Sequence, residues 1–151
     1  MARLILFSPC ERVILAGDQT VSLITLIETL KLEADLSQIT ETDNTTDVAV
    51  PFIWQAVSLW TKEPNDPADL SFEQKLQLEM PDGSIFVEIP LAVKFIDNKQ
   101  NSRGIFKVFG FPIVKESCVA KLRLLANPQQ EWKEVAVFPI SLDVPKPLTN
   151  K

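Results

Sequence analysis

Few side chains in this sequence are suited to catalysis. The chain has two cysteines, Cys10 and Cys118, and neither histidine nor tyrosine. Histidine is the commonest general base near neutral pH and the commonest metal ligand. Its absence removes the Ser-His and Cys-His nucleophile pairs and most transition-metal sites. A carboxylate-only or Ser-Lys enzyme stays formally possible, but no spacing marks such a pair. We therefore expect a protein that is not an enzyme and needs no cofactor.

Loop acids are the remaining candidates for binding chemistry. Asp43 and Asp47 lie in one polar stretch, and Asp66 and Asp69 lie in the next. Clustered carboxylates from loops at one end of a β-sandwich can hold Ca²⁺ through oxygen ligands. Neither spacing matches an EF-hand loop, and solvated surface is the commoner role of such acids. These four aspartates are therefore weak calcium candidates, and we expect no metal site.

Charge is sorted along the chain. Residues 1–89 hold 5 Lys/Arg and 15 Asp/Glu, whereas residues 90–151 hold 10 and 5. Such a split indicates a charged partner or self-association. The pI of about 4.8 argues against nucleic acid as the main partner. Basic side chains on late strands and tryptophans near strand ends are the candidates for an interface. They are Lys107, Lys121, Arg123, Trp60 and Trp132.

Length and composition favour one domain in a reducing compartment. A chain of 151 residues with 46% hydrophobic residues can build one full core. We expect a single domain over residues 1–143 and a flexible C-terminal tail over 144–151, with both cysteines reduced. The apolar run after Arg3 is too short for a signal peptide, and no run is long enough to span a membrane. Cytoplasmic localisation is the expectation.

Short apolar runs with period-2 alternation predict strands throughout. The first strand, Leu4–Phe7, is interrupted at Pro9 and resumes over Arg12–Leu15. A hairpin turn then leads into Val21–Leu32. After the acidic loop Glu33–Asp47, the run Val50–Trp60 is apolar on both faces, which predicts a central strand.

The second half repeats this pattern with clearer turns. Asp82-Gly83 supplies the positive-φ turn of a hairpin, and one strand continues from Ile85 to Phe95. Pro90 within that strand predicts an edge position or a bulge. Gly110 marks a possible bulge in the strand Gly104–Ile113, which follows a polar loop over Asp97–Arg103. Two more strands, 118–126 and 132–142, complete the fold.

About eight strands with turns every 8–15 residues predict an all-β fold. We expect a two-sheet antiparallel β-sandwich, Ig-like or C2-like, with a closed β-barrel as the alternative. A parallel α/β fold is disfavoured because no amphipathic helices alternate with the strands.

Three segments carry a resemblance to a known family. They are Ala2–Ile14 leading into Val21–Ile24, the aromatic strand Pro51–Trp60, and Ser102-Arg103 before an apolar strand. Together they resemble a bacterial family of small β-sandwich proteins without assigned function. The resemblance implies a β-sandwich over most of the chain and brings no catalytic or ligand residues.

The function expected from these patterns is a non-enzymatic module for protein interaction or self-assembly. An acidic loop end and a basic strand face predict association that weakens with salt. The alternative is a ligand-binding β-sandwich for Ca²⁺, a lipid headgroup or a glycan. A role as an enzyme is the third hypothesis.

Overall fold

The described residues form an all-β fold with nine strands in two sheets. The computed structural model describes residues 1–17, 20–31 and 49–144, and it has no helix in these ranges. The strands are β1 (Arg3–Leu15), β2 (Val21–Leu26), β3 (Thr29–Lys31), β4 (Ala49–Thr61), β5 (Ser71–Glu79), β6 (Ile85–Lys94), β7 (Asn101–Pro112), β8 (Cys118–Ala126) and β9 (Lys133–Asp143). The predicted all-β class is confirmed. The predictions for residues 33–47 and for the tail after Val144 lie outside the described residues.

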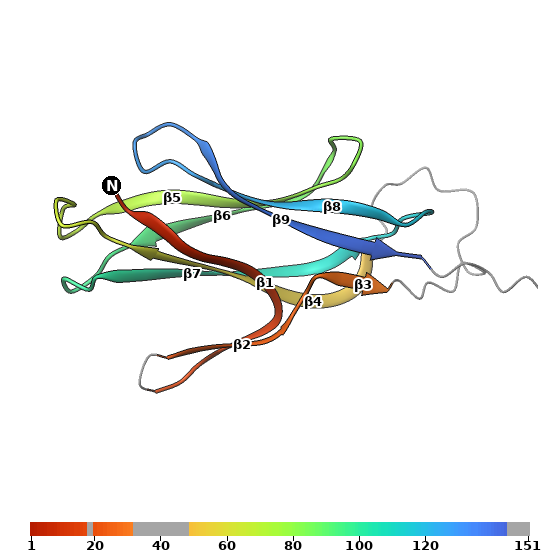
Figure 1. Ribbon diagram of the computed structural model, residues 1–151, viewed down its shortest axis with the longest axis horizontal. Coiled ribbons are helices and arrows are strands. Elements are labelled where there is room, and N and C mark those ends of the chain that lie inside the picture. The colour runs from red at the N-terminus through yellow and green to blue at the C-terminus, as the bar shows by residue number, and fades with distance from the viewer. Residues whose placement is uncertain (18–19, 32–48, 145–151) are drawn as a thin grey trace, which may run out of the picture.

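The strands form two separately hydrogen-bonded sheets that enclose one core. Sheet A has the order β2-β1-β4-β7 and is antiparallel throughout. Sheet B has the order β3-β9-β8-β5-β6 and is mixed, because β3 runs parallel to β9. Figure 1 shows β5, β6, β8 and β9 in the upper layer, with β4 and β7 below them.

The ninth strand corrects the prediction of one strand over Val21–Leu32. The chain changes sheets at Ile27, whose side chain is buried in the core. The Ile27 amide donates to the Pro9 carbonyl of sheet A at 3.2 Å, and the Ser141 amide of sheet B donates to the Glu28 carbonyl at 2.9 Å. The backbone of this segment therefore bonds to sheet A up to Ile27 and to sheet B after it, and β3 pairs with β9 in parallel.

The inward residues of β4 and their aromatic neighbours form one part of the core. Trp54 is fully buried and stacks on Phe111, with ring centroids 4.7 Å apart. Trp60 is 2% exposed and meets Phe72 edge-on at 4.9 Å. Such aromatic contacts add to the stabilisation from burial. The prediction of a central strand here is confirmed, since β4 lies between β1 and β7.

Turn residues sit where their backbone conformations are needed. Gly83 has φ +84° in the β5–β6 hairpin, as predicted. Pro90 lies in β6, the last strand of sheet B, so its missing N–H leaves no ladder bond unmade. Gly110 has φ +81° opposite a register shift between Val50 and Ile53. A bulge therefore lies at this point, but its extra residue is on β4 and not, as predicted, on the strand of Gly110. The predicted loop Asp97–Arg103 is too long, because Asn101 already pairs with Thr61 of β4.

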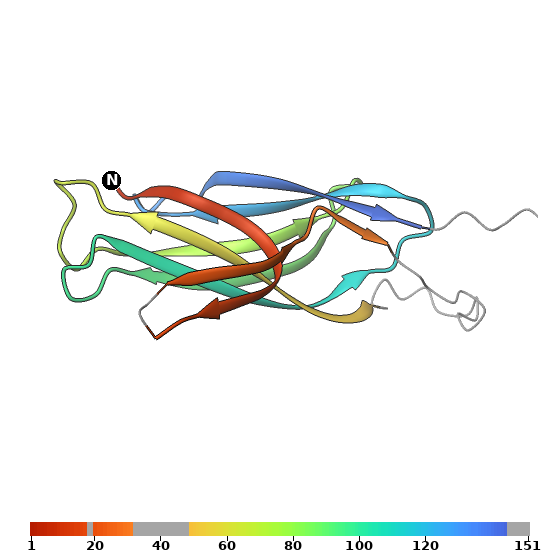
Figure 2. The same ribbon diagram turned by 60° about the horizontal axis from the view of Figure 1, so that its bottom comes forward.

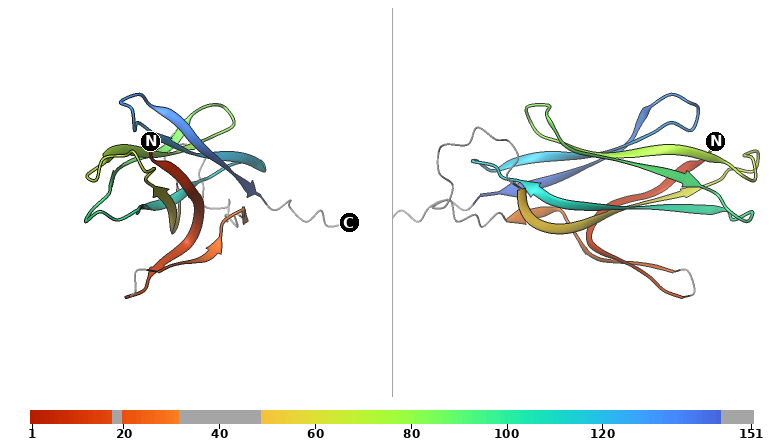
Figure 3. Two further views of the ribbon diagram at one scale, coloured as in Figure 1. Left: turned by 60° about the vertical axis from the view of Figure 1, so that its left-hand side comes forward. Right: turned by 180° about the vertical axis from the view of Figure 1, so that it is seen from behind.

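Strand β1 is continuous through Pro9 but changes neighbours near that point. It pairs with β4 as far as Cys10 and then with β2 from Cys10 to Leu15. The resulting β1–β2 hairpin (residues 11–17 and 20–26) projects from the side opposite to the β5–β6 and β8–β9 loops (Figures 1 and 3). Figure 2 shows this hairpin in front of sheet A. Sheet A therefore carries an extra, partial layer on the side away from the core.

Candidate interaction surface

The outward side of sheet A consists of rows of residues that face one another across β1, β4 and β7. Strand register sets these rows as Leu6–Leu59–Arg103, Ser8–Val57–Ile105, Cys10–Gln55–Lys107 and Ile53–Phe109. Residues opposite one another in antiparallel strands share a face. Inward positions such as Trp54, Ala56, Phe106 and Val108 are buried, so the four rows face away from the core.

The β1–β2 hairpin covers the middle of these rows. Ser8, Cys10 and Val57 are at most 5% exposed although they point away from the core. The Val13 amide donates to Oε1 of Gln55 at 2.6 Å, which ties the hairpin to β4. Burial raises the pKa of the Cys10 thiol above its ordinary value. Cys10 is therefore held as a neutral thiol, the form that is a poor nucleophile.

The last row is uncovered. Phe109 is 67% exposed and its cross-strand neighbour Ile53 is 57% exposed. A large aromatic and a branched aliphatic side chain thus form an apolar pair in water. Single exposed apolar residues are ordinary, whereas contiguous exposed apolar side chains mark interaction sites.

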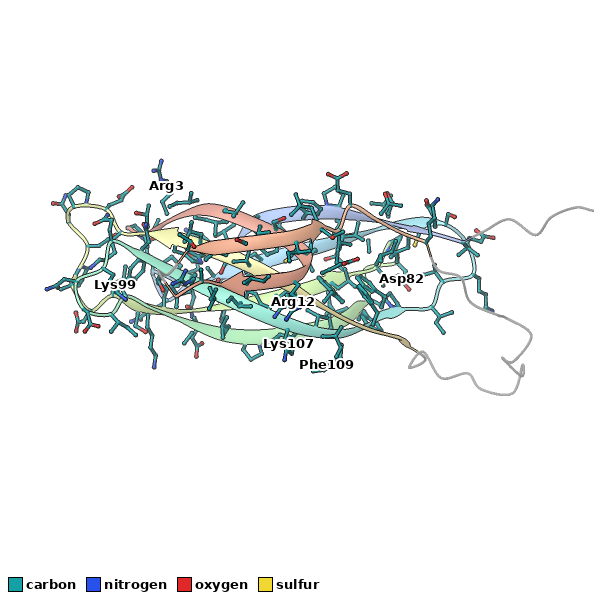
Figure 4. All side chains as sticks on the ribbon, turned by 90° about the horizontal axis from the view of Figure 1, so that it is seen from below. Arg3, Arg12, Asp82, Lys99, Lys107 and Phe109 are labelled. Carbon is teal, nitrogen blue, oxygen red and sulfur yellow. The ribbon has the colours of Figure 1, made fainter. Side chains whose placement is uncertain are left out.

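Basic side chains lie beside this pair. Lys107 is two residues from Phe109 on β7, and in the view of Figure 4 Arg12 of the hairpin projects onto the same region of sheet A. Arg12 and Lys107 are exposed, and neither has an ion pair within the described ranges. Strands β4 and β7 contain no acidic residue. We name Ile53, Gln55, Lys107 and Phe109, with Arg12, the β4–β7 face.

Sheet B presents the opposite electrostatic situation. On its outward side, Arg123 forms ion pairs with Glu79 and with Glu134, the latter at 2.6 Å. The hydrogen bonds that Arg123 donates to the carboxylates of Glu134 and Glu79 raise the pKa of its guanidinium. Lys75 contacts Glu88 at 3.7 Å. These cations are matched by acids of their own sheet, so this side has less unbalanced charge to offer a partner.

The structure separates the five interface candidates predicted from sequence. Lys121 and Arg123 share the outward side of β8, and Lys107 lies on the other sheet. Trp132 precedes β9, 39% exposed, with the Lys75 ammonium 4.6 Å from its ring centroid. Trp60 is in the core, where its Nε1 donates to Oε1 of Gln74 at 3.0 Å, so it contributes no surface.

Sequence reasoning missed Ile53, Phe109 and Arg12. The available signal was the parity of β7: once Phe106 and Val108 point inward, Phe109 and Lys107 must point outward. The register of that strand was ambiguous in sequence because aromatic residues occupy both parities. For Arg12, no sequence signal indicates that the hairpin lies in front of sheet A.

The calcium candidates are only partly described. Asp43 and Asp47 lie outside the described residues. Asp66 accepts from the Met1 amine at 2.9 Å and from the Glu63 amide at 2.8 Å, and these bonds lower the pKa of its carboxyl. Within residues 1–17, 20–31 and 49–144, no three cysteine or acidic side chains gather as a metal site would require. Asp66 is therefore engaged by the protein itself.

Comparisons with known proteins give no family assignment. No protein-family model and no curated protein matches the chain. The described residues also contain no helix that is long and apolar enough to cross a membrane. The functional inference therefore depends on the geometry of the faces.

Proposed function

We propose that the protein is a non-enzymatic interaction module whose β4–β7 face binds an acidic protein partner. The observation that carries the proposal is the exposed pair Ile53 and Phe109 beside Lys107, with Arg12 in front of the same region in Figure 4. Neither cation has an ion pair within residues 1–17, 20–31 and 49–144. Aromatic residues and arginine are the usual centres of binding energy in interfaces. Cations without acids nearby favour a partner of opposite charge and speed its association.

The charge of the β4–β7 face also favours one kind of partner, a different protein, over a second copy of this chain. In a two-fold dimer through the β4–β7 face, the same patch from each copy would meet. Arg12 and Lys107 of one copy would then face a patch that carries the same two cations, and like charges across an interface are costly. An acidic partner instead gains from both cations while covering Phe109. This argument favours a hetero-complex over self-assembly through this face.

The remaining features fit a binding module better than an enzyme. The chain lacks histidine, and Cys10 is buried with a raised pKa. We propose that the two-sheet fold is an Ig-like or C2-like sandwich of the kind the sequence resemblance implies. Such folds present loops and sheet faces to partners. The two unbonded cysteines fit a reducing compartment such as the cytoplasm.

A pair of matched charge reversals tests the proposal. Lys107→Glu changes the β4–β7 face, and Lys121→Glu makes the same change on sheet B. Proteins captured from the native cell by the wild type are identified by mass spectrometry, and the leading candidate is purified. We expect Lys107→Glu to weaken binding of that purified partner by about tenfold, as for loss and reversal of one rim charge. Lys121→Glu should stay within about twofold.

Salt dependence supplies the second readout. Binding through Arg12 and Lys107 should weaken as ionic strength rises from 0.05 to 0.5 M, since the Debye length falls from roughly 14 Å to roughly 4 Å. The opposite ranking of the two variants, or binding that salt does not weaken, contradicts the proposal. A larger loss of partner binding with Lys121→Glu would place the interface on β8, where the sequence also predicted interface residues.

A further inference from the structure

A separate cavity lies between the β1–β2 hairpin and the outward side of sheet A. Its volume is about 600 Å³. Leu6, Val57 and Leu59 line it from sheet A, and Val21 and Leu23 line it from the hairpin. Sites for small molecules commonly have volumes of roughly 300–1,000 Å³ and mostly apolar walls. This cavity is distinct from the β4–β7 face, because it lies at the other end of the same rows.

The aliphatic walls of the cavity favour a ligand segment without polar groups. All five wall residues are aliphatic, so they offer no side-chain donor or acceptor to an occupant. A peptide laid between them would leave backbone amides and carbonyls facing these side chains, and buried polar groups without partners are costly. An alkyl chain has no such groups. Its burial against leucine and valine stabilises the complex by roughly 0.8 kcal/mol for each CH₂.

The rim at the β6–β7 connection is polar and cationic. It is formed by residues 99–103. Ser102 donates to the Lys94 carbonyl, and the side chain of Gln100 donates to the Lys62 carbonyl, so both are engaged within the protein. Lys99 is exposed and has no ion pair within the described ranges, and Figure 4 shows it at the end of the molecule next to this rim. Lys99 and Asn101 are thus free to contact an anionic group at the mouth.

We propose that this cleft binds a single alkyl chain ending in a carboxylate, that is, a long-chain fatty acid. The chain lies between the hairpin and β4, with its methylene groups against Leu6, Val57 and Leu23. The carboxylate stays at the rim, where Lys99 balances its charge and the Asn101 amide can donate to it. The site is independent of the partner-binding function, since it shares no residue with the β4–β7 face.

Titration of the full chain with dodecanoate, below its micelle-forming concentration, tests the site. Isothermal calorimetry should give one binding event per chain. Dodecanol should bind about fivefold more weakly, since one exposed charge contact contributes up to about 1 kcal/mol. Butyrate should not bind detectably. Tighter binding of dodecyl phosphate than of dodecanoate overturns the assignment to a carboxylate, and equal binding of dodecanol overturns the role of the rim.

Two neighbouring residues of β2 provide a matched pair of variants. Leu23 lines the cleft, whereas Ile24 is 41% exposed and does not. Leu23→Asp should weaken dodecanoate binding more than tenfold, because an aspartate in an apolar wall must be desolvated. Ile24→Asp should leave it within about twofold. Equal losses in both variants overturn the proposal.

A third variant keeps the test independent of how the hairpin tolerates aspartate. Lys99→Glu lies on an exposed turn outside the hairpin. This variant should weaken binding of dodecanoate about fivefold and leave binding of dodecanol unchanged. A variant that weakens both ligands equally, or neither, contradicts a carboxylate at the rim.

Discussion

Replacing Gly104 by alanine is expected to lower the free energy of unfolding by about 3 kcal/mol, one of the largest single-residue effects in this fold. Gly104 lies on β7, directly opposite Ser58 of β4. A Cβ added there would lie 2.2 Å from Nε2 of Gln74 and 2.8 Å from Oγ of Ser58. Neither distance is tolerated, so the side chain of Gln74 or the spacing of the two sheets must change.

Gln74 cannot move cheaply, because it is the polar link between the sheets. It is fully buried on β5, and its Oε1 accepts from Ser58 at 2.9 Å and from Trp60 at 3.0 Å. Its Nε2 has no hydrogen-bond partner among the described residues and points at the space that Gly104 leaves open. Displacing the amide would strand two buried donors of β4, and each stranded donor costs roughly 1–3 kcal/mol.

Thermal unfolding followed by circular dichroism measures the effect. A loss of about 3 kcal/mol corresponds to a fall in Tm of roughly 10 °C for a domain of this size. Gly17→Ala is the control, since nothing lies within 4 Å of a Cβ at Gly17. In the background of Gln74→Ala, Gly104→Ala should cost at least about 1 kcal/mol less, because the colliding group is gone. An unchanged Tm for Gly104→Ala, or strict additivity of the pair, contradicts this description of the core.

Replacing Phe109 by aspartate is expected to weaken binding of the acidic partner by at least about thirtyfold, which corresponds to about 2 kcal/mol of binding free energy. The change removes the largest apolar side chain of the β4–β7 face and places a carboxylate beside the cations that attract the partner. Because Phe109 is 67% exposed, the free energy of unfolding should change by no more than about 0.5 kcal/mol. Binding and folding are therefore affected separately.

Calorimetry with the purified partner, together with the unfolding curve of each variant, checks this result. Val137→Asp is the matched control, because Val137 is 45% exposed on β9 of sheet B. It should bind within about twofold of the wild type. A comparable loss in both variants would show that the partner recognises a general apolar surface and not this face.

The alternation of apolar residues was sufficient to predict the class of fold and most strands. It succeeded for β4, where Trp54 and Trp60 share the inward parity, and for the hairpin at Asp82-Gly83. The strand prediction failed at Ile27. The chain passes from one sheet to the other there, and its hydrogen-bond partners are distant residues such as Pro9 and Ser141. A period-2 pattern predicts a strand but does not determine which sheet the strand joins.

The surface was harder to predict than the core. Lys121 and Arg123 were recognisable as outward-facing cations, but their partners were not, and the orientation of Lys107 was ambiguous. Arg123 is neutralised by Glu79 of β5 and Glu134 of β9, strands that only the sheet order brings together. The separation of charge along the sequence is thus not a separation in space on sheet B.

Site-specific photo-crosslinking in the native cell tests the binding face most directly. A photoreactive phenylalanine analogue replaces Phe109 in one variant and Val137 in another, and crosslinked proteins are identified by mass spectrometry. We predict a single acidic partner joined at position 109 and absent at position 137, with Lys107→Glu reducing its yield. Crosslinks only to further copies of this chain, the same proteins at both positions, or a partner joined at 137 alone would contradict the assignment of the β4–β7 face.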